Sequence, residues 1–218
     1  QMKSSKAQEF DSIVIGGGLS GLIIAHQLEG TGRKVALLDA LDVLGGNCRS
    51  YNSQIGLADH GLKFFPATPA ALESLQWLEG VLGESIGITE LDVPPITYDS
   101  GKFQPFVGFG GFTPEAASEL DYFTSPKRLL TEKTPKNWVA RLSESFTGEV
   151  FLQSHLTKLQ FDDGFIIEAL LNGTKKISAR EYIFCAAPAA LGPLIPENAA
   201  SSRQRHRLLK GKFFTAVY

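Results

Sequence analysis

The hydrophobic pattern near the N-terminus predicts a strand, a glycine turn, a helix and a second strand. Residues 12–15 form a short apolar run that stops at three consecutive glycines, a pattern typical of a buried parallel strand. Apolar residues then recur at helical spacing between Leu19 and Leu28, which predicts a helix packed on a sheet. Residues 35–38 are a second apolar run, closed by Asp39. Together these elements predict a βαβ unit with a right-handed crossover.

The middle of the chain has a different pattern. Residues 70–82 carry leucines on one helical face, and prolines and glycines dominate from there to Pro114. The basic stretch 127–136 follows, and then a predicted short helix over 137–146. We interpret residues 66–146 as an inserted substrate or cap segment, because the pattern of buried parallel strands is interrupted there.

Short apolar runs separated by turns return after Glu149. The dipeptide Asn172-Gly173 is a strong hairpin signal between two of them. The last run stops at Pro188, which cannot continue a central strand. The predicted strands of this part cover residues 150–152, 156–161, 165–171, 175–179 and 182–187.

These elements predict an α/β fold, with a Rossmann-like domain built on a central parallel sheet and a β-meander, plus the smaller inserted segment. We expect residues 1–65 and 147–196 to form the two parts of this domain and residues 66–146 to be the insertion. Residues 197–218 are expected to begin a further substrate-domain segment.

Composition narrows the function classes. The chain is 43% hydrophobic and 20% charged, which is ordinary globular usage. Lys+Arg minus Asp+Glu is 21 − 23 = −2, so there is no electrostatic footprint for nucleic acid. Cys48 and Cys185 are too far apart in sequence to predict a disulfide framework or a metal centre. No apolar run is long enough for an integral membrane segment, and the polar start is no signal peptide. We expect a soluble, cytoplasmic protein.

The glycines after the first strand have the spacing Gly16-x-Gly18-x-x-Gly21. The first glycine permits a tight turn, the second lets the backbone approach a pyrophosphate, and the third allows close helix–strand packing. Free N–H groups and the helix dipole then receive the phosphates. Asp39, 18 positions after Gly21 (39 − 21), is placed to accept hydrogen bonds from ribose hydroxyls and to repel a 2′-phosphate. The alternative is a glycine-rich turn that binds nothing, with Asp39 as a surface cap.

Two further motifs follow the acidic residue: a glycine pair at Gly45-Gly46, and Asp59-x-Gly61. This succession resembles the fingerprint of the flavin-containing amine oxidase and phytoene-desaturase-like superfamily. The later strand beginning at Leu156 resembles the one that brings a backbone group to adenine in that family. The run that ends in Ala186-Ala187-Pro188 resembles the family's return strand.

The resemblance implies an FAD-dependent oxidoreductase that moves a hydride from a substrate C–H bond to flavin N5. ADP would lie across the glycine turn, with its ribose on Asp39 and adenine near Leu156. The flavin would extend past the glycine pair toward residues 59–63, and a small-molecule substrate would lie between the sheet domain and the insertion. The residues that the resemblance assigns to the cofactor are Gly16, Gly17, Gly18, Leu19, Ser20, Gly21, Asp39, Ala40, Gly45, Gly46, Asn47, Arg49, Asp59, His60, Gly61, Leu62, Leu156, Ala186 and Ala187.

The sequence also departs from the family pattern. The family commonly has arginines where Val43 and Asn47 stand, and Arg49 lies two residues later. Gly-Gly-Asn resembles the UDP-galactopyranose mutases, which use flavin without net oxidation. The C-terminal Gly-Asp segment of the family does not appear. We therefore expect a fragment, or a site completed by a partner chain or in a homo-oligomer.

These departures leave two alternative functions open. One is a non-catalytic or partner-completed dinucleotide-binding flavoprotein subunit, and the other is a mutase-like flavin enzyme. An NAD-dependent Rossmann enzyme is disfavoured, because the glycine pair and the Asp59 motif have no role in it. No residue is assigned a catalytic role: Cys48, His60 and Lys63 are near the expected flavin, but an ordinary thiol, a turn histidine and a solvated lysine explain them better.

Overall fold

The computed structural model describes residues 8–54, 56–59, 64–106, 126–196 and 203–204. The chain divides into two compact units, one made of Gln1–Arg49 with Val139–Tyr218 and the other of Ser50–Trp138. The sequence places its domain boundaries elsewhere, after residues 65 and 146, and that assignment of domains to functions stays a prediction.

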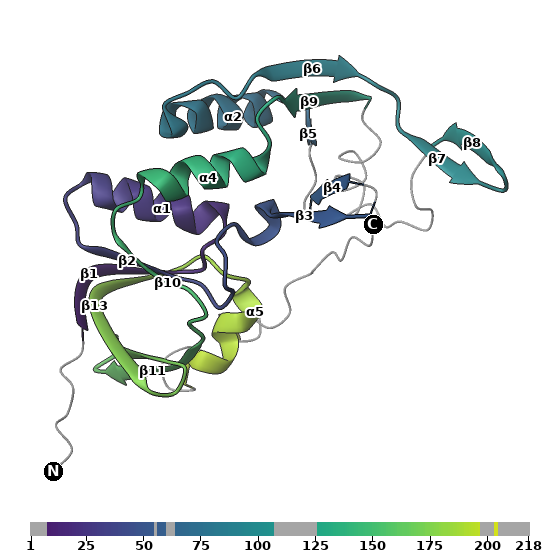
Figure 1. The fold of residues 1–218 in the computed structure, drawn as a ribbon. Coiled ribbons are helices and arrows are strands. Elements are labelled where there is room, and N and C mark those ends of the chain that lie inside the picture. The colour runs from purple at the N-terminus through teal and green to yellow at the C-terminus, as the bar shows by residue number, and fades with distance from the viewer. Residues whose placement is uncertain (1–7, 55, 60–63, 107–125, 197–202, 205–218) are drawn as a thin grey trace, which may run out of the picture. The chain divides into compact units, whose positions relative to one another are not determined.

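The first unit contains a six-stranded sheet in the order β10-β2-β1-β13-β12-β11 (Figure 1). Its first four strands are parallel, and β12 and β11 continue the sheet as an antiparallel meander. This arrangement confirms the predicted Rossmann-like α/β fold with a parallel sheet and a β-meander. The strands are β1 (Gln8–Ile15), β2 (Val35–Leu38), β10 (Glu149–Phe151), β11 (Leu156–Asp162), β12 (Phe165–Leu171) and β13 (Lys175–Phe184).

The predicted βαβ unit is present as β1, α1 (Leu19–Gly30) and β2. The two strands pair in parallel from Ser12↔Val35 to Ile15↔Leu38, so both end at the same edge of the sheet. The amide N–H of Gly16 donates to the carbonyl of Leu38 at 2.8 Å and extends this pairing by one bond. The glycine turn and Asp39 therefore leave the sheet side by side.

One strand is longer than predicted. The expected strands 175–179 and 182–187 form the single strand β13, which ends at Phe184. Residues 179–182 contain no glycine, proline or asparagine to make a turn, and the Ala179 N–H donates to the Tyr182 hydroxyl at 3.1 Å. Because β13 pairs with β12 near its start and with β1 along most of its length, it joins the meander to the parallel sheet.

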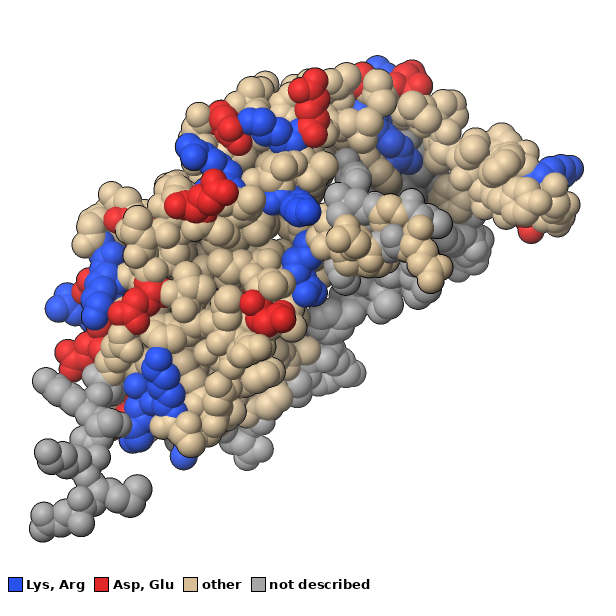
Figure 2. Space-filling view, in the orientation of Figure 1, with Lys and Arg blue, Asp and Glu red and all other residues tan. Residues whose placement is uncertain are grey.

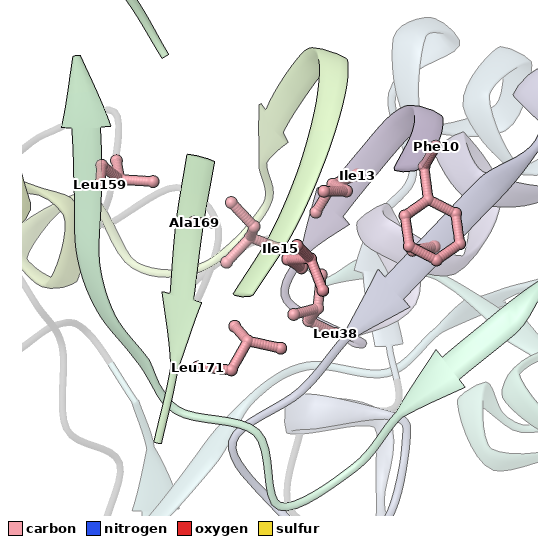
Figure 3. Packing of buried hydrophobic residues seen from close by; sticks show 9 residues of the cluster. Phe10, Ile13, Ile15, Leu38, Leu159, Ala169 and Leu171 are labelled. Atoms are coloured by element: carbon pink, nitrogen blue, oxygen red, sulfur yellow. The ribbon is translucent and has the colours of Figure 1, made fainter. Parts of the chain in front are cut away.

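The core of the first unit lies between the parallel strands and the meander. Figure 3 shows side chains of β1 and β2 and those of β11 and β12 pointing into this space. Helix α1 covers the other side of the parallel strands (Figure 1), with Leu22 and Ala25 fully buried. Short helices α5 (Pro188–Leu191) and η3 (Gly192–Leu194) follow β13, and Leu191 and Leu194 pack against the same cluster. Burial on both faces explains the continuous apolar runs of β1 and β2.

The surface carries both signs of charge. Figure 2 shows Lys and Arg next to Asp and Glu over much of the visible face. Ion pairs include Lys176–Glu168, which joins the adjacent strands β13 and β12, and Arg33–Glu181, which joins the loop before β2 to β13. Arg33 and Glu181 also bond to the hydroxyl of Ser12, the one fully buried polar residue among those described. No helix in the described ranges is long and apolar enough to cross a bilayer.

The described residues of the second unit form small sheets and the long helix α2. Helix α2 (Pro69–Leu82) begins after Thr68, whose hydroxyl accepts the Ala71 N–H, and ends at Gly83 with φ +68. It buries Leu75, Leu78 and Leu82 of the predicted leucine face, whereas Leu72, near the start of the helix, is exposed. The strands of the second unit form three small sheets. The first pairs β3 (Ser50–Ser53) with β4 (Gly56–Asp59), and the second has the order β5 (Phe64–Pro66), β9 (Lys127–Thr131), β6 (Ile88–Asp92). The third is the hairpin of β7 (Ile96–Asp99) and β8 (Lys102–Pro105). Helix α4 (Pro135–Ser145) follows, near the predicted 137–146.

Two isoleucines of the sheet offer a test of where the core lies. We expect Ile13→Ala to lower the free energy of unfolding by about 2–5 kcal/mol, because Ile13 is fully buried and truncation leaves a cavity. Ile167→Ala makes the same chemical change at a side chain that is 43% exposed, and we expect a loss of about 1 kcal/mol or less. Urea unfolding monitored by circular dichroism gives both values, and equal losses would contradict the described core.

Candidate functional site

The turn between β1 and α1 and the first turn of α1 contain three glycines at which a side chain would not fit without a shift of its neighbours. Gly16 has φ +109, and a Cβ there would lie 2.8 Å from the carbonyl carbon of Cys185. A Cβ on Gly21 would lie 1.8 Å from the carbonyl oxygen of Gly16. A Cβ on Gly17 would lie 2.4 Å from Cδ2 of Leu44. The end of β13, the turn and the first turn of α1 are therefore packed backbone to backbone, as a phosphate-binding turn requires.

Helix α1 begins without a side-chain cap. Gly18 is its N-cap residue, and the first turn contains no acidic residue. Leu19 and Ser20 occupy the first two helical positions, and the side chain of Ser20 is exposed. No carboxylate in the first turn therefore neutralises the positive end of the helix dipole. A helix N-terminus of this kind favours the binding of an anion.

The second glycine pair rests directly on this turn. The Gly45 N–H donates to the carbonyl of Gly17 at 2.8 Å, and Gly45 forms an isolated parallel bridge with Gly18. A Cβ on Gly46 would lie 3.2 Å from Cα of Gly18. Both residues have positive φ, +119 for Gly45 and +52 for Gly46, which favours glycine. The two glycine motifs, which are separate in sequence, are thus in direct backbone contact.

The carboxylate of Asp39 is held at the same place. Its Oδ2 accepts the Gly17 N–H at 2.7 Å, and its Oδ1 accepts the Leu41 N–H at 2.8 Å. A carboxylate has about four lone-pair positions, so acceptor capacity remains for sugar hydroxyls. The sequence predicts the contact of Asp39 with the ribose, but it does not predict the hydrogen bond from Gly17. Through this bond, Asp39 also stabilises the turn. Ala40 follows it and is exposed.

The short helix η1 (Gly46–Cys48) begins at the second glycine of the pair. Asn47 is exposed, and Nε of Arg49 donates to the carbonyl of Gly46 at 2.8 Å. Burial raises the pKa of the Cys48 thiol, and it does the same for Cys185. A raised pKa keeps both thiols protonated, which is typical of packed cysteines rather than reactive ones.

Three of the residues that the sequence assigns to the cofactor lie in the second half of the chain: Leu156, Ala186 and Ala187. Ala186 and Ala187 follow β13 and are exposed, and the Cys185–Ala186 backbone is the surface that Gly16 touches. Leu156 is half-buried at the start of β11. The segment before it reaches Asp39, because the Ser154 N–H donates to the Asp39 carbonyl at 2.9 Å.

The flavin-side motif is described only in part. Asp59 is the last residue of β4 and belongs to the second unit. His60, Gly61, Leu62 and Lys63 lie outside the described residues, so their assignment stays a prediction. Within the described ranges, no three His, Cys, Asp or Glu residues gather as metal ligands.

Sequence reasoning missed two residues that shape the site. Leu44 fills the space beside Gly17, and a γ-carbon of Val139 in α4 would lie 3.3 Å from a Cβ on Gly45. Leu44 had a local signal, because it is an apolar residue directly before the glycine pair. Val139 had none, since only tertiary packing brings α4 to that turn.

Comparisons with known proteins agree with this geometry. Residues 14–78 match the family described as NAD(P)-binding Rossmann-like domain. The chain is 48% identical over 40 residues to UDP-galactopyranose mutase of Mycoplasma pneumoniae, which is 18% of this chain and 10% of that protein. It is 45% identical over 49 residues to a possible lysine-specific histone demethylase 1 of Drosophila melanogaster, covering 22% of this chain and 6% of the other.

Solved structures extend the likeness to most of the chain. Putrescine oxidase has a TM-score of 0.65 at 14% identity, over 93% of this chain and 64% of that one. Cyclohexylamine oxidase from Brevibacterium oxydans has a TM-score of 0.64 at 15% identity, over 91% of this chain and 62% of the other. The chain thus has a Rossmann-like α/β fold. Its fold is the one found in these amine oxidases, of which it spans somewhat less than two thirds, and the resemblance seen in the sequence is confirmed at the level of the fold.

Two glycines of α1 test the packing of the turn. We expect Gly21→Ala to destabilise the chain by about 2 kcal/mol or more, because the added methyl group overlaps the Gly16 carbonyl oxygen. Gly30→Ala is the matched control, since a Cβ at Gly30 meets nothing within 4 Å and alanine favours a helix by up to about 1 kcal/mol. Thermal unfolding compares the variants, and a Gly21→Ala protein as stable as wild type would contradict the close packing.

Proposed function

We propose that this chain binds FAD and forms the dinucleotide-binding part of an oxidoreductase of the amine oxidase and desaturase type. One observation carries the proposal: the glycine pair 45–46 is bonded to the phosphate turn 16–18, with the carboxylate of Asp39 on the same backbone. A Rossmann turn that bound NAD would need the first motif and the acid, but it would have no use for the second glycine turn.

The ADP half fits the residues present. The space that side chains would fill at Gly16, Gly17 and Gly21 is taken by neighbouring backbone and by Leu44, so main-chain N–H groups at the start of α1 would receive the diphosphate. Asp39 would hold the ribose hydroxyls with the acceptor positions that Gly17 and Leu41 leave open. The segment before Leu156 would border the adenine, because its backbone is bonded to Asp39.

When bound, FAD would supply the acceptor for a hydride from a substrate C–H bond. The residues of this chain would then have three tasks: to bind the cofactor, to orient it and to exclude water. Backbone at Gly45 and Gly46 would border the middle of the cofactor, and Asn47, Arg49 and residues 59–62 would lie on its way to the ring. A small-molecule substrate, a homo-oligomer or completing partner chain and a cytoplasmic location remain part of the proposal.

A mutase-like flavin enzyme is the second candidate. It is supported by the 48% identity over 40 residues to UDP-galactopyranose mutase and by the Gly-Gly-Asn sequence at residues 45–47. A partner-completed dinucleotide-binding subunit stays the third alternative that the sequence predicts. Both candidates keep the same ADP site and differ from the first in what happens at the flavin ring.

We expect the purified chain to be yellow or to become so on addition of FAD, with the visible absorbance of a bound flavin. Asp39→Ala should weaken FAD binding by roughly 10- to 100-fold, because it removes charge-assisted hydrogen bonds to the ribose and frees the Gly17 amide. Asp42→Ala removes an exposed acid three residues further on and should leave FAD binding unchanged.

Fluorescence titration with FAD measures these affinities. A chain that takes up no FAD, or an Asp39→Ala variant that binds FAD as tightly as the Asp42→Ala control, would contradict the proposal. Anaerobic addition of an amine then separates the candidates: bleaching of the flavin supports an oxidase. Turnover of a sugar nucleotide without consumption of an electron acceptor supports a mutase.

A further inference from the structure

The segment that leads into β11 is bonded to the loop that carries the acid of the proposed site. The Ser154 N–H donates to the Asp39 carbonyl at 2.9 Å, and the Gln153 N–H donates to the Leu41 carbonyl at 2.8 Å. Both acceptors follow directly after β2. These two bonds hold residues 153–155 beside Asp39 from one side.

The backbone of this segment adopts a conformation that needs further support. Gln153 has φ +49, which lies in the left-handed region that residues other than glycine, asparagine and aspartate rarely adopt. Such a conformation is unfavourable by itself and persists only where the surrounding structure fixes it. Contacts from outside the segment are therefore needed to keep residues 153–155 in place.

Asn172 supplies such contacts from the turn between β12 and β13. Its Oδ1 accepts the His155 N–H at 2.9 Å, and its Nδ2 donates to the Gln153 carbonyl at 2.9 Å. The Asn172 N–H donates to the His155 carbonyl at 2.8 Å. One residue thus makes three hydrogen bonds to a short segment that lies 17 to 19 positions before it in the sequence.

An amide side chain fits this place better than its isosteres. Asn172 has φ +51 and Gly173 has φ +74, as the two central residues of a tight hairpin turn require, and asparagine tolerates this conformation. The sequence predicts the turn from the Asn-Gly pair, but it does not predict the bonds of the side chain. A carboxylate would accept the His155 N–H but could not donate to the Gln153 carbonyl, so aspartate would keep one side-chain bond and lose the other.

We propose that Asn172 is a positioning residue for the adenine side of the nucleotide site. It acts through residues 153–155, whose backbone it holds beside Asp39, rather than by contact with the ligand. A segment that is already held in one conformation loses less freedom when a ligand binds. This inference rests on the proposed function and deepens it, because it names a group outside the glycine turns that prepares the site for the base.

Asn172→Gly removes the side chain and keeps the turn, because glycine also adopts positive φ. We expect FAD and ADP to bind roughly 3- to 10-fold more weakly, since the segment that would border the adenine loses two of its hydrogen bonds. Inorganic pyrophosphate, which lacks the adenine, should bind equally tightly to the variant and to wild type. Fluorescence titration of the full chain with FAD, alone and with ADP or pyrophosphate as competitor, gives these affinities.

Two further measurements separate positioning from a general loss of structure. Asn172→Asp keeps the size of the side chain but places a carboxylate oxygen against the Gln153 carbonyl, so it should weaken ADP binding at least as much as Asn172→Gly. Hydrogen exchange followed by mass spectrometry should show faster exchange at residues 153–155 in Asn172→Gly, because the His155 N–H loses its acceptor. Unchanged exchange there would overturn the proposal.

Asp163→Gly is the matched control. Asp163 has φ +44 and lies in the turn at the other end of β11, so this substitution makes the same backbone change away from the segment and should alter neither ADP affinity nor exchange at residues 153–155. An Asn172→Gly protein that binds ADP like wild type, or that loses ADP and pyrophosphate equally, would also overturn the proposal. If wild type binds neither ADP nor FAD, the proposed function itself fails, whereas hydrogen exchange still reports whether Asn172 holds the segment.

Discussion

The structure depends on the close approach of backbone to backbone at the carboxyl edge of the parallel sheet. Three chain segments meet there without intervening side chains: the end of β13, the turn at Gly16–Gly21 and the turn at Gly45–Gly46. Only glycine lets main chains approach so closely, and the result is a surface of peptide groups at the N-terminus of α1. A surface of this kind binds the part of a nucleotide that is common to all dinucleotides.

Asp39 shows how one residue serves both the fold and the site. Its position directly after β2 is fixed by the pairing of Ile15 with Leu38. From there, its carboxylate reaches the Gly17 amide across the turn, and its backbone bonds to Phe151 and Ser154. The acid thus ties β2, the turn and the segment that enters β11 together. These bonds within the chain fix the position of the carboxylate beside the turn.

The sequence was most informative where burial leaves a simple pattern. The strands at residues 12–15 and 35–38 are buried on both faces, so their apolar runs predict them well. The strands of the second unit were not predicted, because strands such as β6 and β7 are short and largely exposed, so burial leaves no clear apolar pattern in their sequence. Within the site, the spacing of the glycines is a local signal. The contact of Gly46 with Gly18 is not, since it joins residues far apart in sequence through tertiary packing.

The described residues of the proposed site are those that would hold the nucleotide, not those that would carry out the reaction. The same chain shares sequence with a mutase and a fold with amine oxidases, which catalyse different reactions. In this chain, peptide groups and the carboxylate of Asp39 lie together at the turn between β1 and α1. The reaction depends instead on the groups that surround the flavin ring and the substrate. A fixed nucleotide site with a variable ring environment therefore explains how one backbone arrangement is compatible with both an oxidase and a mutase.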